Sequence, residues 1–170
     1  MLLYQSGNKS FSQQGVSIVE ALIAIMIITV ALTSILGLAT LSSIVTSIAK
    51  QTTQASLFAQ DTMEALRNFR DGTDWNVNGL GTFPLDTAHY VQQIGSPAQW
   101  QLVVGSEIID GFTRSVQFQE TRRDSVTKDI VETGGDLDPD TKRVVVEVSW
   151  EERGRSHEVE LVTYLTNWKQ

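Results

Sequence analysis

The first pattern along the chain is a long apolar run near its N-terminus. From Ala21 to Leu41, 16 of 21 residues are Ala, Leu, Ile, Met or Val, and only Thr, Ser and Gly interrupt them. A helix that spans a bilayer needs about 20 apolar residues at a rise of about 1.5 Å per residue. A cleaved secretory signal has a shorter apolar core, of about 7–15 residues, behind a basic start. The run therefore predicts a transmembrane helix.

Beyond this run the apolar residues recur every three or four positions, with polar residues on the remaining faces. The recurring residues are Ile48, Ala55, Phe58, Ala59, Met63, Leu66 and Phe69. This spacing predicts an amphipathic helix with one packed stripe. No Pro interrupts residues 16–70, and Gly72 with the Asn- and Asp-rich residues after it predicts the helix end. We therefore expect one helix, with residues 16–45 in the membrane or filament core and residues 46–70 as its amphipathic continuation.

After the helix the period changes from about 3.6 residues to two. Residues 71–98 are rich in Gly, Asn, Asp and Pro, which predicts a long surface loop with a short strand at 90–94. Alternation of apolar and polar residues over 100–104 and 112–119 predicts two half-buried strands. With a C-terminal hairpin, four antiparallel strands are expected to pack on the amphipathic helix, so that residues 71–170 complete a compact α+β headpiece.

The register of the C-terminal hairpin follows from the parity of its apolar positions. A loop of two or four residues pairs positions whose numbers sum to 307, and a one-residue slip would put the two apolar sets on opposite faces. The favoured register pairs Trp150 with His157, Val148 with Val159 and Val146 with Leu161. It also places Glu147 opposite Glu160 on the outer face, a repulsion that Lys or Arg from a neighbouring strand or subunit would relieve.

Charge is distributed unevenly along the 170 residues, whose net charge is −7. Residues 21–49 carry no charge. Lys9 and Lys50 are two of the 13 basic residues and Glu20 is one of the 20 acidic ones, so residues 51–170 hold 11 basic and 19 acidic residues, a net −8. This acidic balance disfavours binding to a nucleic-acid backbone. The absence of Cys excludes a disulfide, a thiolate zinc site and a cysteine nucleophile.

Glu20 lies at the start of the apolar stretch. An ionised group in mid-bilayer costs about 2.5–3.5 kcal/mol on insertion scales, so a buried Glu20 is expected to have a partner. Alternatively, Glu20 marks the membrane interface near a helix start, where the helix dipole favours a carboxylate. Lys9 and Lys50 flank the segment with equal charge, so the count of positive residues leaves its orientation open.

These residues together resemble the N-terminal signature of type IV pilins and type II secretion pseudopilins. The chain has a short polar leader (residues 1–15) that ends in Gly15, then Val16, three mostly apolar residues, Glu20 and the long apolar run. The resemblance implies that a prepilin peptidase cuts between Gly15 and Val16, methylates the amine of Val16 and leaves 155 of the 170 residues. It also implies that Glu20 pairs with the N-terminal amine of a neighbouring subunit. Two departures are Val16, where the family usually has Phe, and Gly37, where many major pilins have Pro.

The resemblance implies a structural subunit with no catalytic role. Residues 59–67 are similar to the corresponding segment of minor pilins and pseudopilins of the I/V group. We therefore expect a single-pass inner-membrane protein with an extracytoplasmic headpiece, which an assembly platform incorporates with other subunits into a cell-envelope filament. In secretion pseudopili the tip subunit typically lacks the Glu, so Glu20 suggests a position within or below the tip complex.

Two alternative functions remain. The first is a type II secretion minor pseudopilin, which neighbouring genes would distinguish from a pilus subunit. The second is a single-pass anchored binding domain with an uncleaved signal anchor, which predicts a full-length N-terminus.

Candidate chemical sites in the headpiece are few, and we expect no cofactor apart from a calcium alternative. Asp136, Asp138 and Asp140 alternate in an acidic run and are able to converge oxygen ligands on calcium, as in some pseudopilin loops. The favoured interpretation is a type I turn over residues 138–141, with Pro at its second position. His89 and His157 have no third ligand at metal spacing, and His157, beside Trp150, is expected in a packed or rim position.

Two further motifs have a plain structural interpretation. Residues 79–81 (Gly-Leu-Gly) lack the preceding strand and following helix of a nucleotide loop, so we expect a turn. Arg122, Arg123 and Lys128 are able to contact DNA, as some competence pilins do. Acidic residues lie among them, so a mixed solvated surface is favoured and nucleic-acid binding is not expected.

Overall fold

The computed structural model describes residues 17–169, and its first element is the long helix α1, Ile18–Gly72. This helix has 55 residues, which corresponds to a length of about 80 Å. The chain divides into two compact units, Met1–Thr46 and Ser47–Gln170, which we call the anchor unit and the headpiece. Residues 1–15, the predicted leader, lie outside the described residues, as does Val16.

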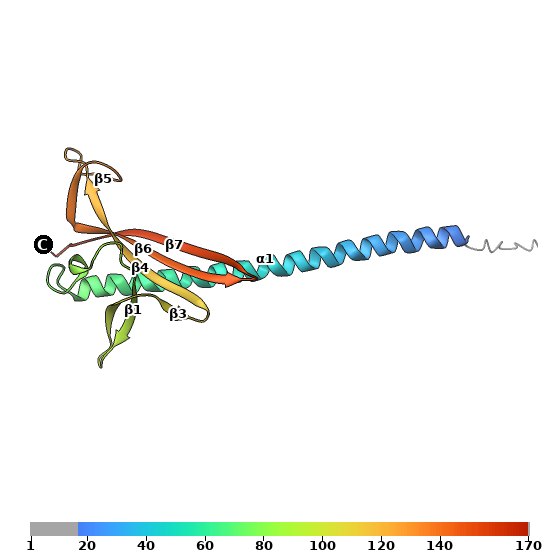
Figure 1. The fold of residues 1–170 in the computed structure, drawn as a ribbon, viewed down its shortest axis with the longest axis horizontal. Helices are drawn as coiled ribbons and strands as arrows, with labels where there is room; N and C mark the ends of the chain where they lie inside the picture. The colour runs from blue at the N-terminus through green and yellow to red at the C-terminus, as the bar shows by residue number, and fades with distance from the viewer. Residues whose placement is uncertain (1–16, 170) are drawn as a thin grey trace, which may run out of the picture. The chain divides into compact units, whose positions relative to one another are not determined.

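In the headpiece, seven strands of the described residues form one antiparallel sheet with the order β2-β1-β4-β6-β7, and β3 and β5 both pair with β4 (Figure 1). A short 3₁₀ helix, η1, spans Leu80–Thr82. The strands are β1 His89–Ile94, β2 Gln99–Val104, β3 Glu107–Ile109, β4 Phe112–Arg123, β5 Ile130–Val131, β6 Asp136–Glu152 and β7 Arg155–Thr166. The α+β layout expected of a pilin, one long N-terminal helix with an antiparallel sheet, is confirmed.

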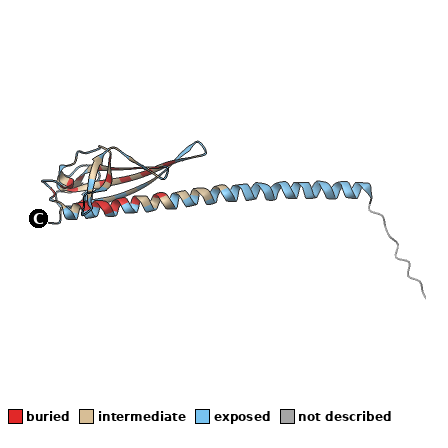
Figure 2. Cartoon of the chain, turned by 90° about the horizontal axis from the view of Figure 1, so that it is seen from below, coloured by how far each residue is buried: buried red, intermediate tan, exposed pale blue. Residues whose placement is uncertain are grey.

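The helical part of the headpiece buries one face. Figure 2 shows this face in red where it meets the sheet. The buried residues are Ala55, Ala59, Thr62, Met63, Ala65, Leu66 and Phe69, so the predicted stripe is largely confirmed. Opposite them, alternate residues of β4 and β6 complete the core, with Val116, Phe118, Val144, Val146 and Val148 fully buried. Alternation places these side chains on one face because successive residues of a strand point to opposite sides.

The predicted register of the β6–β7 hairpin is confirmed. Trp150 pairs with His157, Val148 with Val159, Val146 with Leu161 and Glu147 with Glu160. Glu152 pairs with Arg155, so the loop has two residues, Arg153 and Gly154, with φ angles of 53° and 74°. Two consecutive positive φ angles are the signature of a type I′ turn, whose twist matches that of the flanking strands.

Three expectations differ from the structure. The sequence predicted four strands and one further short strand in the preceding loop. The sheet of the described residues has seven strands, because β3 and β5 add short pairings with β4. The expected surface loop contributes to the core, with Trp75 and Leu80 among its buried residues. The expected turn at residues 138–141 lies inside β6, where the pairing with β4 moves from Glu120–Lys142 to Thr121–Asp138. The turn-forming residues therefore make a bulge.

Candidate functional site

The anchor unit presents an apolar surface. Between Ile18 and Leu41 every Ile, Leu, Val and Met side chain is more than half exposed, from 54% at Ile23 to 80% at Ile18 (pale blue in Figure 2). Within residues 17–169, one helix, α1, is long enough and apolar enough to cross a membrane. A helix that is apolar on all sides requires lipid or other helices around it.

Hydroxyl groups within this surface are satisfied inside the helix. Thr29, Thr33, Ser34 and Thr40 each donate to a backbone carbonyl three or four residues earlier, at 2.8–3.1 Å. Lipid offers no hydrogen-bond partner, so an internal acceptor removes the penalty for burying a hydroxyl. The Thr and Ser residues that interrupt the apolar run are therefore compatible with a bilayer or a helix bundle.

Glu20 lies in the first turn of α1 and makes no ion pair with any residue from 17 to 169. Its carboxylate is near the positive end of the helix dipole, which favours a negative charge there. Gly15 and Val16, the predicted cleavage and methylation residues, lie outside the described residues.

The headpiece carries an open pocket of about 530 Å³ beside the β4–β6 bulge. Its lining includes Asp86, Glu120 and Glu132 as acids, Arg122 and Arg143 as bases, and Gln119, Thr121, Ile130, Val131 and Tyr164. Thr121 is only 2% exposed, and its hydroxyl has no hydrogen-bond partner in the described residues. Because the acids and bases nearly balance, the pocket does not select an anion or a cation by net charge.

The candidate calcium residues are not brought together in the structure. Asp138 Oδ2 accepts a hydrogen bond from Arg123 Nε at 2.6 Å, and Asp140 Oδ1 accepts one from Asn167 Nδ2 at 3.1 Å. Asp136 lies at the start of β6, where its backbone is opposite that of Arg123 in the β4–β6 ladder. Across residues 17–169, no group of three or more His, Asp or Glu is arranged to hold a metal ion.

The ion pair of Asp138 also sets its protonation. Burial acts to raise the pKa of Asp138, but hydrogen bonds from Arg123, Thr141 and the backbone N–H of Asp140 outweigh it and hold the pKa below 3.8. Asp138 is therefore ionised at neutral pH and fastens the bulge to β4.

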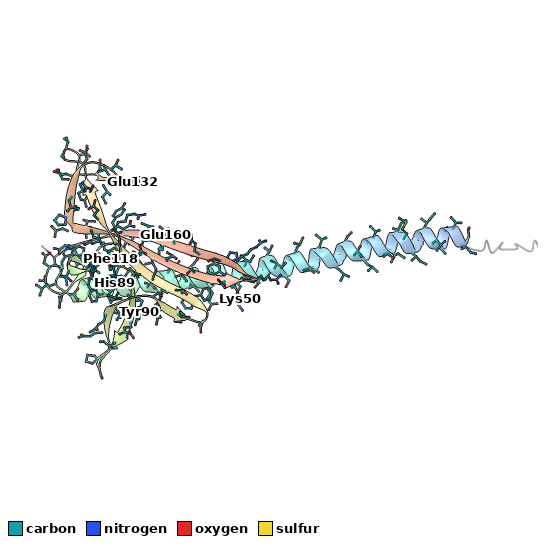
Figure 3. The ribbon with its side chains drawn as sticks, viewed as in Figure 1. Lys50, His89, Tyr90, Phe118, Glu132 and Glu160 are labelled. Atoms are coloured by element: carbon teal, nitrogen blue, oxygen red, sulfur yellow. The ribbon has the colours of Figure 1, made fainter. Side chains whose placement is uncertain are left out.

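Both histidines lie against aromatic rings. His89 is 1% exposed, packs near Phe83 and Phe118, and has Nδ1 2.8 Å from the Thr87 carbonyl oxygen (Figure 3). His157 stacks on Trp150 with ring centroids 5.4 Å apart. Residues 79–81 overlap the 3₁₀ turn η1. The stacking of His157 agrees with the packed or rim position expected from the sequence, and η1 agrees with the expected turn.

The predicted basic group is engaged with its own headpiece. Arg122 pairs with Glu120 at 2.8 Å. Besides its bond to Asp138, Arg123 donates to the Lys128 carbonyl oxygen at 3.0 Å. Arg122 and Arg123 therefore lie in a surface of mixed charge.

Arg114 is a buried cation that the sequence reasoning missed. It lies on the inner face of β4 with its side chain 6% exposed, and it pairs with Glu107 of β3 and, at 3.4 Å, with Asp61 of α1. The sequence does carry a signal for this burial: Arg114 alternates with the apolar residues Phe112 and Val116, which places all three on one face of the strand. Arg114 joins three elements, so its truncation would leave two carboxylates without their cation.

The outer face of the β6–β7 hairpin is acidic. Glu147 and Glu160 are directly opposite, Glu151 and Glu158 occupy the same face, and the six ion pairs within the described residues include none of the four (Glu160 is labelled in Figure 3). The neighbouring strand β4 brings Ser115, not Lys or Arg, opposite Glu147. The repulsion expected from the sequence is therefore not relieved by a neighbouring strand of the headpiece.

Comparisons of the chain with protein-family models, with curated proteins and with solved structures give no match.

Proposed function

We propose that this chain is a minor type IV pilin-like subunit, held in the inner membrane by α1 and assembled into a cell-envelope filament. The observation that carries the proposal is the change of environment along α1. Its first part is apolar and exposed between Ile18 and Leu41, and its last part is packed on a sheet through one face. An anchor that exchanges lipid for neighbouring helices requires the first property, and a headpiece on the same helix requires the second.

The N-terminal signature adds the assembly step to the proposal. After cleavage behind Gly15, the methylated amine of Val16 in one subunit would meet the Glu20 carboxylate of another. A carboxylate surrounded by apolar helices is costly unless an opposite charge pairs with it. Pairing would therefore favour the one axial register in which an amine and a carboxylate coincide. The role is mechanical, and the headpiece supplies lateral contacts.

Substitution of Glu20 tests this role. In cells that make the filament, Glu20→Gln should leave the amount of headpiece in the inner membrane unchanged and deplete the protein from sheared filaments by at least tenfold. Glu64→Gln is a matched control, because Glu64 lies on the same helix with a side chain that is 64% exposed. Normal incorporation of Glu20→Gln would remove Glu20 from the mechanism.

A second candidate function, a membrane-anchored binding domain, is favoured by the pocket beside Thr121. The pocket is lined by Glu120, Arg122 and Arg143, whose charged groups are suitable partners for a polar ligand. In this function the signal anchor would stay uncleaved, so Met1 would be present in the membrane-extracted protein.

A further inference from the structure

The β6–β7 hairpin ends beside the point where the chain enters the headpiece. Ser47 is the first residue of the headpiece, and its hydroxyl donates to Glu152 Oε1 at 2.7 Å. Lys50 follows one helical turn later, and Figure 3 shows it where the hairpin reaches α1. Arg153 and Arg155 lie at the turn that follows Glu152. Lys50, Arg153 and Arg155 therefore gather at the entry end of the headpiece, and we call them the basic tip.

The basic tip is available to an external partner. Lys50, Arg153 and Arg155 are exposed, and the ion pairs within residues 17–169 use none of them. Of the two neighbouring acids, Glu152 is turned toward the helix and its Oε2 is buried, whereas Glu151 lies opposite Ser156 on the outer face. The tip therefore presents three cations on a headpiece that is otherwise acidic.

Two glutamates of the acidic outer face, Glu158 and Glu160, are largely screened from the tip, whereas Glu151 is adjacent to it. Glu158 and Glu160 are three and five residues beyond Arg155 on β7, which corresponds to about 10 and 16 Å along a strand. The Debye length at physiological ionic strength is about 8 Å. A negatively charged surface that approaches the tip is therefore attracted more strongly by the arginines than it is repelled by these two glutamates.

Turn geometry does not explain the arginine at position 153. The first central residue of a type I′ turn has positive φ, and Asn, Asp and Gly are favoured there. Arg153 occupies it with φ 53°. A long cation is thus present where the local backbone prefers a short polar residue, which points to a use for its charge.

The chain length places a membrane surface within reach of the tip. Ser47 follows Leu41, the end of the apolar run, by six residues, which is about 9 Å of helical chain. The headgroup layer on each side of a bilayer is about 5–8 Å thick. If the apolar run lies in lipid, the chain enters the headpiece at the outer edge of the headgroup layer.

We propose that the basic tip binds the headgroups of anionic phospholipids and holds the headpiece against the membrane before assembly. This inference rests on the proposed membrane anchoring. Near an anionic surface each Lys or Arg changes the ratio of docked to undocked headpiece by about fivefold. Removal of Arg153 and Arg155 together should therefore lower that ratio by about 25-fold.

The test uses the full chain in phospholipid vesicles. Because the chain has no Cys, Ser156→Cys provides a single exposed labelling position beside the tip, and Val126→Cys provides a control label in the β4–β5 connection. Quenching of each label by nitroxide headgroups is measured in phosphatidylcholine vesicles and in vesicles with about one-third phosphatidylglycerol. Flotation of the vesicles with the protein measures anchoring separately.

The variants separate charge from folding. We expect quenching at position 156 to rise in the anionic vesicles and to fall in about 1 M salt, where the Debye length is about 3 Å. The pair Arg153→Asn and Arg155→Gln should abolish the rise, and the pair Arg153→Lys and Arg155→Lys should keep it. Arg67→Gln removes an exposed cation elsewhere on α1 and should also keep the rise. Asn suits the turn, so the first pair should fold at least as well as the parent.

Each contrary result has a distinct meaning. Equal quenching in both kinds of vesicle, or an equal loss in the Lys variants, overturns the inference while flotation still supports anchoring. Quenching that follows the protein-to-lipid ratio and not the lipid charge assigns the tip to the acidic face of a second copy, and also overturns it. A chain that does not float overturns the membrane anchoring and this inference with it.

Discussion

Replacement of Leu66 by Ala tests the packing of α1 on the sheet. Leu66 is fully buried at the centre of the helix stripe, so Leu66→Ala removes buried apolar surface and leaves a cavity. Substitutions of this kind lower the free energy of unfolding by about 2–5 kcal/mol. The headpiece has 124 residues between Ser47 and Gln170, for which a total stability of about 6–18 kcal/mol is usual. The loss should therefore be a large fraction of the whole.

Leu57→Ala is the matched control, because Leu57 lies on the same helix and is 59% exposed. The intrinsic helix preference changes equally in both variants, so the difference between them reports packing alone. Leu57→Ala should change the stability by at most about 0.5 kcal/mol.

Tryptophan fluorescence during urea unfolding is the assay. The four Trp residues of the chain all lie after position 70, so the signal reports the headpiece even when the full chain is held in detergent. With a urea dependence of about 2 kcal/mol per molar, the loss of about 2–5 kcal/mol in Leu66→Ala should lower the midpoint by roughly 1–2.5 M. Equal midpoints for the two variants would refute the packing described for α1.

Three further outcomes follow from the headpiece. Hydrogen bonds that outweigh burial hold the pKa of Asp138 below 3.8, so its pair with Arg123 stabilises the fold above about pH 4 and loses this effect as the pH falls through the folded pKa. Asp138→Asn should lower the stability at pH 7 by about 1 kcal/mol and reduce the fall in melting temperature as the pH is lowered. An unchanged dependence of the melting temperature on acid pH would contradict this. Glu147→Lys should raise the free energy of unfolding by about 0.2–1 kcal/mol, because it replaces a repulsive pair with Glu160 by an attractive one, and a lower midpoint of urea unfolding would argue against the register. Melting temperatures in calcium and in chelator should coincide, and a rise in calcium would show that the aspartates of this region rearrange around the ion.

The elements that could be predicted from the sequence are those whose pattern is local. The helix stripe follows from a spacing of three and four residues, and the β6–β7 register follows from parity and a short loop. In both cases a shift of one residue would expose a whole apolar face to water. Glu147 and Glu160 were therefore placed opposite each other without any knowledge of the remaining strands.

Features that depend on distant contacts could not be predicted in this way. Trp75 is buried in the core, and its Nε1 donates to the Pro139 carbonyl oxygen at 3.2 Å, across 64 positions of chain. Pro139 itself lies in a sequence that favours a turn, but Thr141 beside it is fully buried and its hydroxyl is 3.2 Å from that of Thr166. Tertiary contacts therefore keep this segment within β6 as a bulge, and no local propensity reports them.

The candidate sites also differ in whether they depend on local patterns or on distant contacts. The apolar run and Glu20 are features of consecutive residues and were identified directly. The basic tip needs the hairpin to return to the start of the headpiece helix, which is a consequence of the fold. The hydrogen bond between Ser47 and Glu152 places the hairpin turn beside the start of the headpiece helix.

The N-terminus of the protein extracted from the membranes of its own cells tests the central proposal most directly. Peptide mass spectrometry should find a chain of 155 residues that begins with N-methylated Val16. A variant in which Gly15 is replaced by a bulky residue should accumulate uncut and serves as the reference for the unprocessed mass. A native protein that still begins with Met1 would contradict the pilin-like function and favour the anchored binding domain.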